Sequence, residues 1–231
     1  MAPFAVILDV DGTLVNSNDA HARAWVDAFN EAGIDVSHDR VRRAIGMGGD
    51  KLMPHVAGIR EDSREGSRIS KRRGEIFREH HLPHLSAFPL VRDLVQRFIT
   101  DGYTVVVASS AQSDELSQLL KIAGVSDLIA ATASSSEASR SKPDPDIVQA
   151  ALQRSGAPAE QAIMLGDTPY DVEAALRAGI AVVGVESGGW SAEDLRGAVE
   201  VHPEAAGIYG HYGESAFARL IRAGRLTSRI S

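Results

Sequence analysis

The chain has 231 residues, enough for one large α/β domain or for a smaller core that carries an insert. Its 31 Asp and Glu residues outnumber 24 Lys and Arg residues, and the formal charge of −7 argues against wholesale binding of nucleic acid. The chain contains no cysteine, which excludes disulfide bonds, thiol catalysis and thiolate metal sites. No stretch approaches the ~20 apolar residues that span a membrane, and Met1–Leu8 has no basic segment, so we expect a soluble, cytoplasmic protein without membrane contacts.

Short apolar runs, each ending at polar residues, recur along the chain. They cover residues 4–8, 104–108, 162–165 and 181–185, with a weaker run over 128–133. Runs of four to six residues that are rich in Val and Ile and do not alternate are typical of strands buried on both faces. The sequence therefore predicts a parallel sheet.

Amphipathic segments of helical length separate these runs. They cover residues 91–100, 113–122, 146–154 and 170–178, and a glycine suited to a helix C-terminus follows, namely Gly102, Gly124, Gly156 and Gly179. This alternation predicts an α/β fold with a Rossmann-like parallel sheet flanked by helices. Ligands bind such sheets beyond the carboxyl ends of the strands, where Asp9, Ser109 and Asp167 lie.

One interval breaks the alternation. Residues 15–87 contain no strand-like run but do contain helical segments at 21–32 and 67–80. We therefore expect a helical subdomain at 15–87 and a core made of residues 1–14 and 88–231. Residues 60–79 include seven basic and five acidic side chains, which we interpret as a solvated helix face with ion pairs.

Two acids follow the first predicted strand. Asp9 and Asp11 are one residue apart and are followed by Gly12, so both carboxylates can face the same pocket. Such a pair can act as a nucleophile with a general acid/base, or can bind a divalent metal ion. The alternative is a simple turn with capping aspartates.

Two more acids follow the third strong apolar run. Thr168 and Pro169 fit the N-cap and first position of a helix, which accounts for Asp171 in the first turn without any function. Helix capping does not account for Asp167. With Asp9 and Asp11, these residues would place three or four carboxylates in a small region, and their repulsion predicts a bound Mg²⁺ ion.

Three further side chains suit the binding of a phosphate group. Ser109 and Ser110 stand between a strand and a helix, although an N-cap role is equally compatible with the sequence. Lys142 lies in a loop stiffened by Pro143 and Pro145, and a lone surface lysine is the alternative. Beside a phosphate and a nucleophilic aspartate, one fixed cation would complete the site.

The segment Gly46–Lys51 has the glycines of a phosphate-binding loop but lacks its GxxxxGK[ST] spacing and its preceding strand. We interpret it as a turn between helices that faces the pocket, with Gly48 and Lys51 as candidates for substrate binding. His21, near the start of the first helix of this region, has either a structural role or a contact with substrate.

The order and spacing of these motifs resemble the haloacid dehalogenase superfamily, in the subgroup that carries a helical cap after the first strand. The motifs are the segment Asp9–Thr13, Ser109, Lys142 before proline, and Gly166-Asp167 with Asp171. The resemblance extends from Ala5 to about Ser187. Phosphoglycolate phosphatases and β-phosphoglucomutase belong to the same subgroup.

The resemblance implies a role for each motif. Asp9 would form an aspartyl-phosphate, and Asp11 would protonate the leaving oxygen and then activate water. Ser109 and Lys142 would hold the phosphoryl oxygens. Mg²⁺ would be bound by Asp9, the main-chain carbonyl of Asp11 and Asp167, with Asp171 in a direct or an indirect role.

The expected function is therefore that of a Mg²⁺-dependent phosphatase that acts on a small phosphorylated metabolite, as a monomer or weak homodimer. The superfamily's dehalogenases lack an acid at the position of Asp11, which favours phosphoryl transfer. A phosphomutase is the alternative, although Gly49 stands where β-phosphoglucomutase has a phosphate-binding arginine. A non-catalytic protein with the same fold is a third hypothesis.

Overall fold

The computed structural model describes residues 3–135 and 140–227, so part of the serine-rich loop 134–141 lies outside the described residues. Its centre is a six-stranded sheet in the order β3-β2-β1-β4-β5-β6. All five strand pairs are parallel. The strands are β1 (Phe4–Leu8), β2 (Tyr103–Ser109), β3 (Ala131–Ser134), β4 (Ala162–Gly166), β5 (Ala181–Val185) and β6 (Glu200–His202). The predicted α/β fold with a Rossmann-like sheet is confirmed.

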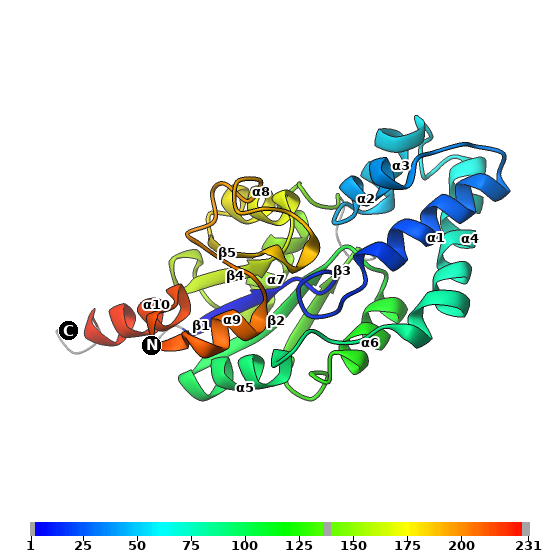
Figure 1. The fold of residues 1–231 in the computed structure, drawn as a ribbon. Coiled ribbons are helices and arrows are strands. Elements are labelled where there is room, and N and C mark those ends of the chain that lie inside the picture. Colours follow the sequence, from blue (N-terminus) through cyan, green and yellow to red (C-terminus); the bar gives the residue numbers. More distant parts are fainter. Residues whose placement is uncertain (1–2, 136–139, 228–231) are drawn as a thin grey trace.

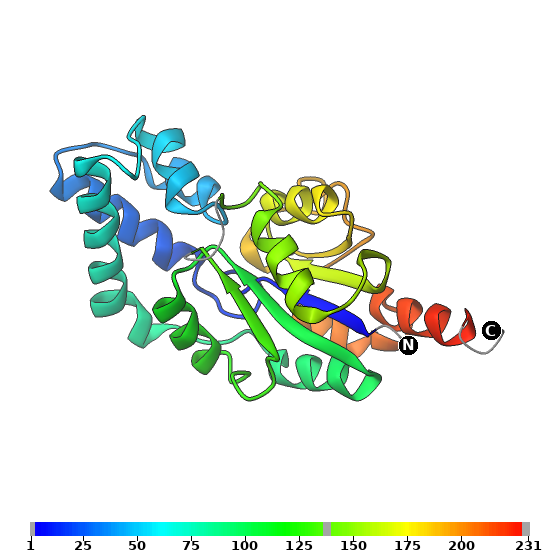
Figure 2. The same ribbon diagram turned by 180° about the vertical axis from the view of Figure 1, so that it is seen from behind.

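Helices cover both faces of the sheet because alternate residues of each central strand are buried on opposite sides. In β1, Ala5 and Ile7 pack with α7 (Asp146–Ser155) and α8 (Pro169–Arg177). Val6 and Leu8 belong to the larger core on the other face. That face is covered by α5 (Val91–Asp101), α6 (Ser113–Ile122), α9 (Ala205–Gly210) and α10 (Ala216–Thr227), as Figures 1 and 2 show.

Four helices between β1 and α5 form a separate group, which we name the helical insert (residues 18–84). They are α1 (Asn18–Glu31), α2 (His38–Ala44), α3 (Gly49–Ala57) and α4 (Arg64–Ile76), and α4 continues into a π-helical turn at Phe77–His81. The insert lies beside the carboxyl ends of the strands, and the two chain termini lie at the opposite end of the sheet (Figures 1 and 2). The predicted boundaries at 15 and 87 stay a prediction.

Local signals in the sequence account for most helix ends. Gly102, Gly124, Gly156 and Gly179 follow or end their helices with φ of 99°, 68°, 70° and 78°, the left-handed conformation that favours glycine. Thr168 caps α8 as expected, with Pro169 at its first position.

The predictions were less accurate at the edges of the sheet. The weak run at 128–133 gives a strand only from Ala131 to Ser134, because Leu128 and Ile129 instead pack as half-buried residues of a turn. The three-residue strand β6 was not predicted, since its residues are all half-buried at the sheet edge. In the described part of the chain, no helix is long and apolar enough to cross a membrane.

Candidate active site

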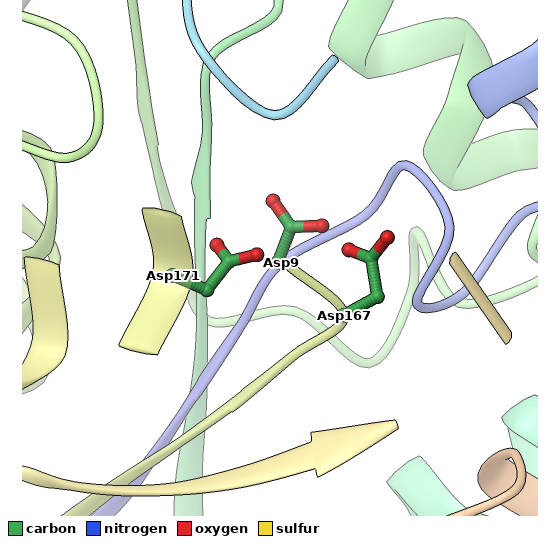
Figure 3. Close-up of side chains that lie close together, drawn as sticks. All are labelled: Asp9, Asp167 and Asp171. Atoms are coloured by element: carbon green, nitrogen blue, oxygen red, sulfur yellow. The ribbon is translucent and has the colours of Figure 1, made fainter. Parts of the chain in front are cut away.

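Three buried aspartates meet at the carboxyl edge of the sheet. Asp9 directly follows β1, Asp167 directly follows β4, and Asp171 lies in the first turn of α8. One carboxylate oxygen from each residue lies within 4.8 Å of the others (Figure 3). We name Asp9, Asp167 and Asp171 the acidic cluster. The parallel strands thus bring together residues that are more than 150 positions apart.

A buried lysine, Lys142, contacts two members of this cluster. The Lys142 ammonium lies 2.6 Å from Asp9 Oδ1 and 2.7 Å from Asp171 Oδ1, and the lysine is only 1% exposed. Lys142 is followed by a cis peptide bond to Pro143. Among the described residues, Lys142 is the cation that forms ion pairs with the cluster, and it contacts two of its three carboxylates. Arg42 also interacts electrostatically with Asp167. Three carboxylates in so small a buried space remain short of cations.

Hydroxyl and amide donors hold the aspartates in place. The Thr13 hydroxyl is 3.1 Å from Asp167 Oδ1 and 3.2 Å from Asp9 Oδ2. The Asn18 side-chain amide donates to Asp167 Oδ2 at 2.8 Å. Asp171 Oδ2 accepts hydrogen bonds from the Thr168 amide and hydroxyl at 3.0 and 2.7 Å. Asp171 therefore caps α8 and contacts Lys142 at the same time.

Burial dominates the electrostatics of the cluster. It raises the pKa of Asp9 to about 7, although Lys142 opposes the shift, and the negative charges of Asp171 and Asp11 add to it. Burial and the charge of Asp9 likewise raise the pKa of Asp167 well above its ordinary value. Carboxyl groups that hold their protons this strongly are expected to ionise when a cation joins them. The donor set, carboxylates in a small buried space, is one that Mg²⁺ prefers.

Asp11 is held apart from the acidic cluster by residues of the segment after β1 and of α1. Its Oδ1 accepts a hydrogen bond from the Ser17 hydroxyl at 2.5 Å and lies 2.8 Å from His21 Nε2. Burial opposes ionisation, but His21, Ser17 and the nearby Arg73 together lower the pKa of Asp11. His21 in turn stacks on Phe77, with ring centroids 4.0 Å apart.

A pocket opens above these acids, between the sheet edge and the helical insert. Its lining includes Asp9, Asp11, His21, Ser110 and residues 45–49. The predicted turn is confirmed only for residues 46–48, between α2 and α3, whereas Gly49–Lys51 form the first turn of α3. Gly48 lines the pocket. Ser110 also donates to the Gly46 carbonyl at 3.1 Å. Ser109 is fully buried at the end of β2, where its hydroxyl accepts from the Ala111 amide at 3.1 Å.

The pocket lining also includes an ion pair that was not predicted. The Arg73 Nη1 of α4 lies 3.0 and 3.2 Å from the two carboxylate oxygens of Glu115 in α6. The side chains of Arg73 and Glu115 are only 13% and 6% exposed. The Arg73 guanidinium also lies 5.1 Å from the ring centre of Trp25. The expected solvated helix face is therefore wrong at Arg73, because α4 turns this residue toward the core.

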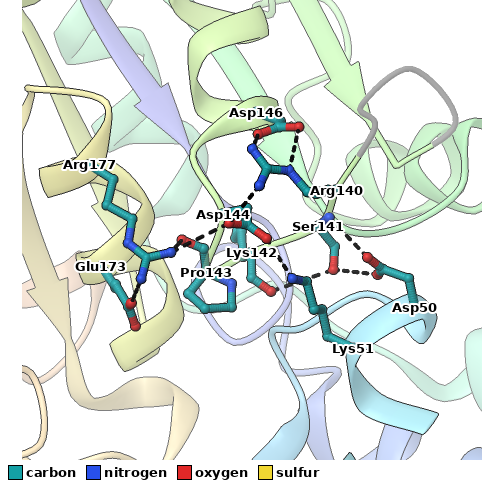
Figure 4. A network of polar contacts seen from close by, with 10 residues as sticks. All are labelled: Asp50, Lys51, Arg140, Ser141, Lys142, Pro143, Asp144, Asp146, Glu173 and Arg177. Carbon is teal, nitrogen blue, oxygen red and sulfur yellow. Dashed lines mark hydrogen bonds and ion pairs between the residues drawn. The ribbon is translucent and has the colours of Figure 1, made fainter. Parts of the chain in front are cut away.

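Lys51 lies in a second set of contacts between the insert and the core (Figure 4). Its ammonium is 2.5 Å from Asp144, and the neighbouring Asp50 accepts a hydrogen bond from Ser141. Arg140 and Arg177 also approach Asp144, each at 3.5 Å. Lys51 is not among the described residues that line the pocket, which gives no support to its predicted contact with substrate.

Two glycines allow the backbone to pass close to Asp167. A β-carbon at Gly12 or at Gly188 would overlap the Asp167 Oδ2 atom. Gly12 also has φ of 77°, a left-handed conformation that L side chains rarely adopt. A side chain at either position would therefore displace the carboxylate.

Comparison with known proteins agrees with this geometry. The profile of the haloacid dehalogenase-like hydrolases matches residues 6–185, from β1 through β5. The chain belongs to this family. The resemblance seen in the sequence is thereby confirmed, as is the expectation of an enzyme.

Individual relatives extend the comparison. A phosphoglycolate phosphatase of Rhodospirillum rubrum is 29% identical over 225 residues, which cover 89% of each chain. The chloroplastic protein SUPPRESSOR OF QUENCHING 1 of Arabidopsis thaliana is 33% identical over 187 residues, which are 79% of this chain but only 18% of that much longer protein. The crystal structure of a hydrolase from Pseudomonas syringae superposes with a TM-score of 0.86 at 27% identity, covering 92% of this chain and 99% of that one.

Proposed function

We propose that the protein is a Mg²⁺-dependent phosphatase that hydrolyses a small phosphomonoester through an aspartyl-phosphate on Asp9. The observation that supports this most directly is the acidic cluster, in which a pocket-lining aspartate is paired with a buried lysine. The names of relatives such as the Rhodospirillum rubrum enzyme support the same class of reaction. Nucleophile, fixed cation and excess of carboxylates are the parts that phosphoryl transfer requires.

The first half of the reaction uses Asp9 and Asp11. An oxygen of Asp9 attacks phosphorus, the bond from phosphorus to the ester oxygen breaks, and Asp11 gives its proton to the departing oxygen. The negative charge of a phosphate dianion beside Asp11 raises the pKa of this residue, so that Asp11 is protonated before the reaction begins. Ser17 and His21 hold Asp11 in a fixed orientation for the transfer.

In the second half, Asp11 takes a proton from a water molecule, whose oxygen attacks phosphorus. The bond from Asp9 to phosphorus breaks, and inorganic phosphate and the free carboxylate of Asp9 are formed. Lys142 contacts Asp9 throughout, and we assign it, with the amides and hydroxyls at Ser109 and Ser110, to the phosphoryl oxygens.

Asp9 and Asp167, with the main-chain carbonyl of Asp11, would hold Mg²⁺, which supplies positive charge to the phosphoryl group and the acidic cluster. Asp171 already accepts three hydrogen bonds from Lys142 and Thr168. We therefore assign Asp171 mainly to the orientation of Lys142. Asn18 and Thr13 keep Asp167 directed toward the cluster.

The helical insert would act as a cap that excludes bulk water from the pocket. The turn at 45–49 and the contacts of Lys51 and Asp50 hold the insert against the core. Gly48 makes this close approach possible, since a β-carbon there would lie 2.6 Å from the Ser141 β-carbon.

The test is the release of phosphate from p-nitrophenyl phosphate and from a panel of sugar, nucleotide and glycolate phosphates, with Mg²⁺ and with a chelator. We expect Mg²⁺-dependent turnover that falls by about 10³-fold or more in Asp9→Asn, while the circular dichroism spectrum is unchanged. Glu75→Gln, which removes a half-exposed carboxylate of the insert, is the matched control. Undiminished turnover in Asp9→Asn would refute the proposed nucleophile.

The phosphomutase alternative has less support. Such an enzyme must hold the second phosphate of a bisphosphate, and Gly49 provides no side chain at the expected position. A β-carbon at Gly49 would instead meet the Glu61 carboxylate, which would repel a phosphate. Isomerisation of a hexose phosphate primed by a bisphosphate would establish the alternative.

A further inference from the structure

The pocket has basic groups on two sides, and each already faces a carboxylate. Among the described residues, the basic side chains that line the pocket are His21 and Arg73. His21 lies against Asp11, and Arg73 contacts both carboxylate oxygens of Glu115. Lys142, just below the pocket, is shared by Asp9 and Asp171. A substrate that enters the pocket therefore meets no uncompensated cation beyond the phosphoryl site.

Arg73 and Glu115 line the same pocket as the two acids proposed to act on the phosphoryl group, and the charge of Arg73 acts on Asp11. Asp9 and Asp11, which act on the phosphoryl group, belong to the same pocket. Trp25, Ile45 and Met47 also line this pocket and add apolar surface to it. The leaving group is thus surrounded by apolar side chains and by one neutralised ion pair.

We infer that this pocket selects a phosphate ester whose leaving group is a neutral, hydroxylated alcohol, such as a polyol or a sugar, and that Glu115 is the residue that rejects a second anionic group. The inference rests on the proposed phosphatase function. A carboxylate or second phosphate would have to compete with Glu115 for Arg73 and would be repelled by Glu115 at close range. A hydroxyl group can donate to Glu115 and accept from Arg73 without breaking their ion pair.

The unused hydrogen-bonding capacity of Arg73 agrees with this. Its Nη1 donates to Glu115, whereas its Nε is buried and has no hydrogen-bond partner among the described residues. A buried donor without an acceptor is costly, and an oxygen of the bound alcohol can relieve that cost. Because the Nε atom is buried, an alcohol oxygen reaches it only when the side chains around it shift.

The experiment compares two esters that differ only at the far end of the leaving group. They are 2-hydroxyethyl phosphate and 2-phosphoglycolate, in which a CH₂OH group is replaced by a carboxylate. We expect kcat/KM of the wild-type protein to favour the alcohol by about tenfold or more, a difference of ~1.4 kcal/mol. The pair sn-glycerol 3-phosphate and 3-phosphoglycerate repeats the comparison in a larger leaving group.

Variants of the ion pair move this ratio in opposite directions. Glu115→Gln frees Arg73 to bind the carboxylate of the substrate and lowers the preference for the alcohol ester by about tenfold. Arg73→Gln leaves Glu115 without its ion-pair partner and raises this preference. Glu75→Gln, on the same helix as Arg73 but paired with Arg72, leaves the ratio unchanged. A merely structural role for the pair would lower both kcat/KM values together and keep their ratio constant.

The outcomes separate this inference from the proposed function. Hydrolysis of p-nitrophenyl phosphate, together with equal or better use of 2-phosphoglycolate by the wild-type protein, overturns the inference and leaves the phosphatase intact. An unchanged ratio in folded Glu115→Gln overturns the role of Glu115. No Mg²⁺-dependent hydrolysis of any ester refutes the proposed function and this inference with it.

Discussion

At the carboxyl ends of β1 and β4, three buried carboxylates lie together and one ammonium group contacts two of them, whereas elsewhere in the pocket lining Arg73 faces the single carboxylate of Glu115. The acidic cluster has an excess of negative charge, and burial, together with the neighbouring carboxylates, raises the pKa of Asp9 and Asp167. The ion pair is balanced. The comparison indicates that the first region is arranged for a further cation, and the second for an uncharged group.

The strongest test of this contrast removes the ammonium group that contacts the acidic cluster. Lys142→Met takes the ion-pair partner from two buried carboxylates, Asp9 and Asp171. Such a change typically costs 3–5 kcal/mol, roughly 10 °C in Tm for a chain of this size. We expect this loss at pH 8 without Mg²⁺, and a fall in kcat of about 10²-fold or more when Mg²⁺ is present. Thermal unfolding and phosphate release measure the two effects.

Lys51→Met provides the matched control. This lysine also contacts an aspartate, but its side chain is 36% exposed, and exposed ion pairs contribute ~0–1 kcal/mol. We expect a Tm change of at most a few degrees and an unchanged KM. An equal effect of the two substitutions would contradict the special status of the acidic cluster.

The second prediction concerns pH. The pKa of Asp9 is raised from 3.8 to about 7, so in the absence of metal the folded protein binds this proton more tightly than the unfolded chain does. The resulting contribution to the free energy of unfolding is present below pH ~4 and is lost as the pH rises through about 7. Asp167 acts in the same direction. Mg²⁺ competes with these protons, so the rise in Tm on adding MgCl₂ should be small at pH 5 and several degrees larger at pH 8.

NaCl at the same ionic strength controls for general screening, and Asp167→Asn should reduce the dependence of the Mg²⁺ effect on pH. An equal Mg²⁺ effect at pH 5 and pH 8 would show that protons and the metal do not share the cluster.

The third prediction, with the smallest net effect, concerns the balanced pair. Removing one partner, as in Arg73→Met or Glu115→Leu, leaves a buried charge and should cost about 3 kcal/mol of unfolding free energy. Replacing both partners in Arg73→Met/Glu115→Leu should return the stability to within about 1 kcal/mol of the wild-type protein. Urea unfolding measures all four proteins. Additive losses in the double variant would show that the two charges do not compensate each other.

The sequence predicted the parts of the molecule that depend on local patterns. Runs of Val and Ile indicate buried strands. Because the carboxyl ends of parallel strands meet at one edge of the sheet, the acids that follow these runs were expected to lie together, and Asp9, Asp167 and Asp171 were therefore candidates for one site. Ser110, Gly48 and His21 were also found to line the pocket or to contact its acids.

The remaining residues depend on how distant helices pack. Arg73 belongs to a run of charges that is otherwise typical of a solvated face, and only the packing of α4 on α6 brings it to Glu115. Asn18 is an ordinary residue at the start of α1, and its contact with Asp167 is 149 positions away in the sequence. Neither contact has a local signal. The edge strand β6 was not predicted for a related reason: a half-buried strand has no apolar run in its sequence.

Gly12 and Gly188 have a consequence for laboratory evolution of this enzyme. At each glycine the main chain lies directly against the Asp167 carboxylate, so even the methyl group of an alanine would overlap that carboxylate. Libraries that aim to change the preferred ester should therefore leave both glycines untouched, and should vary Glu115 together with Arg73 so that neither buried charge is left without its partner.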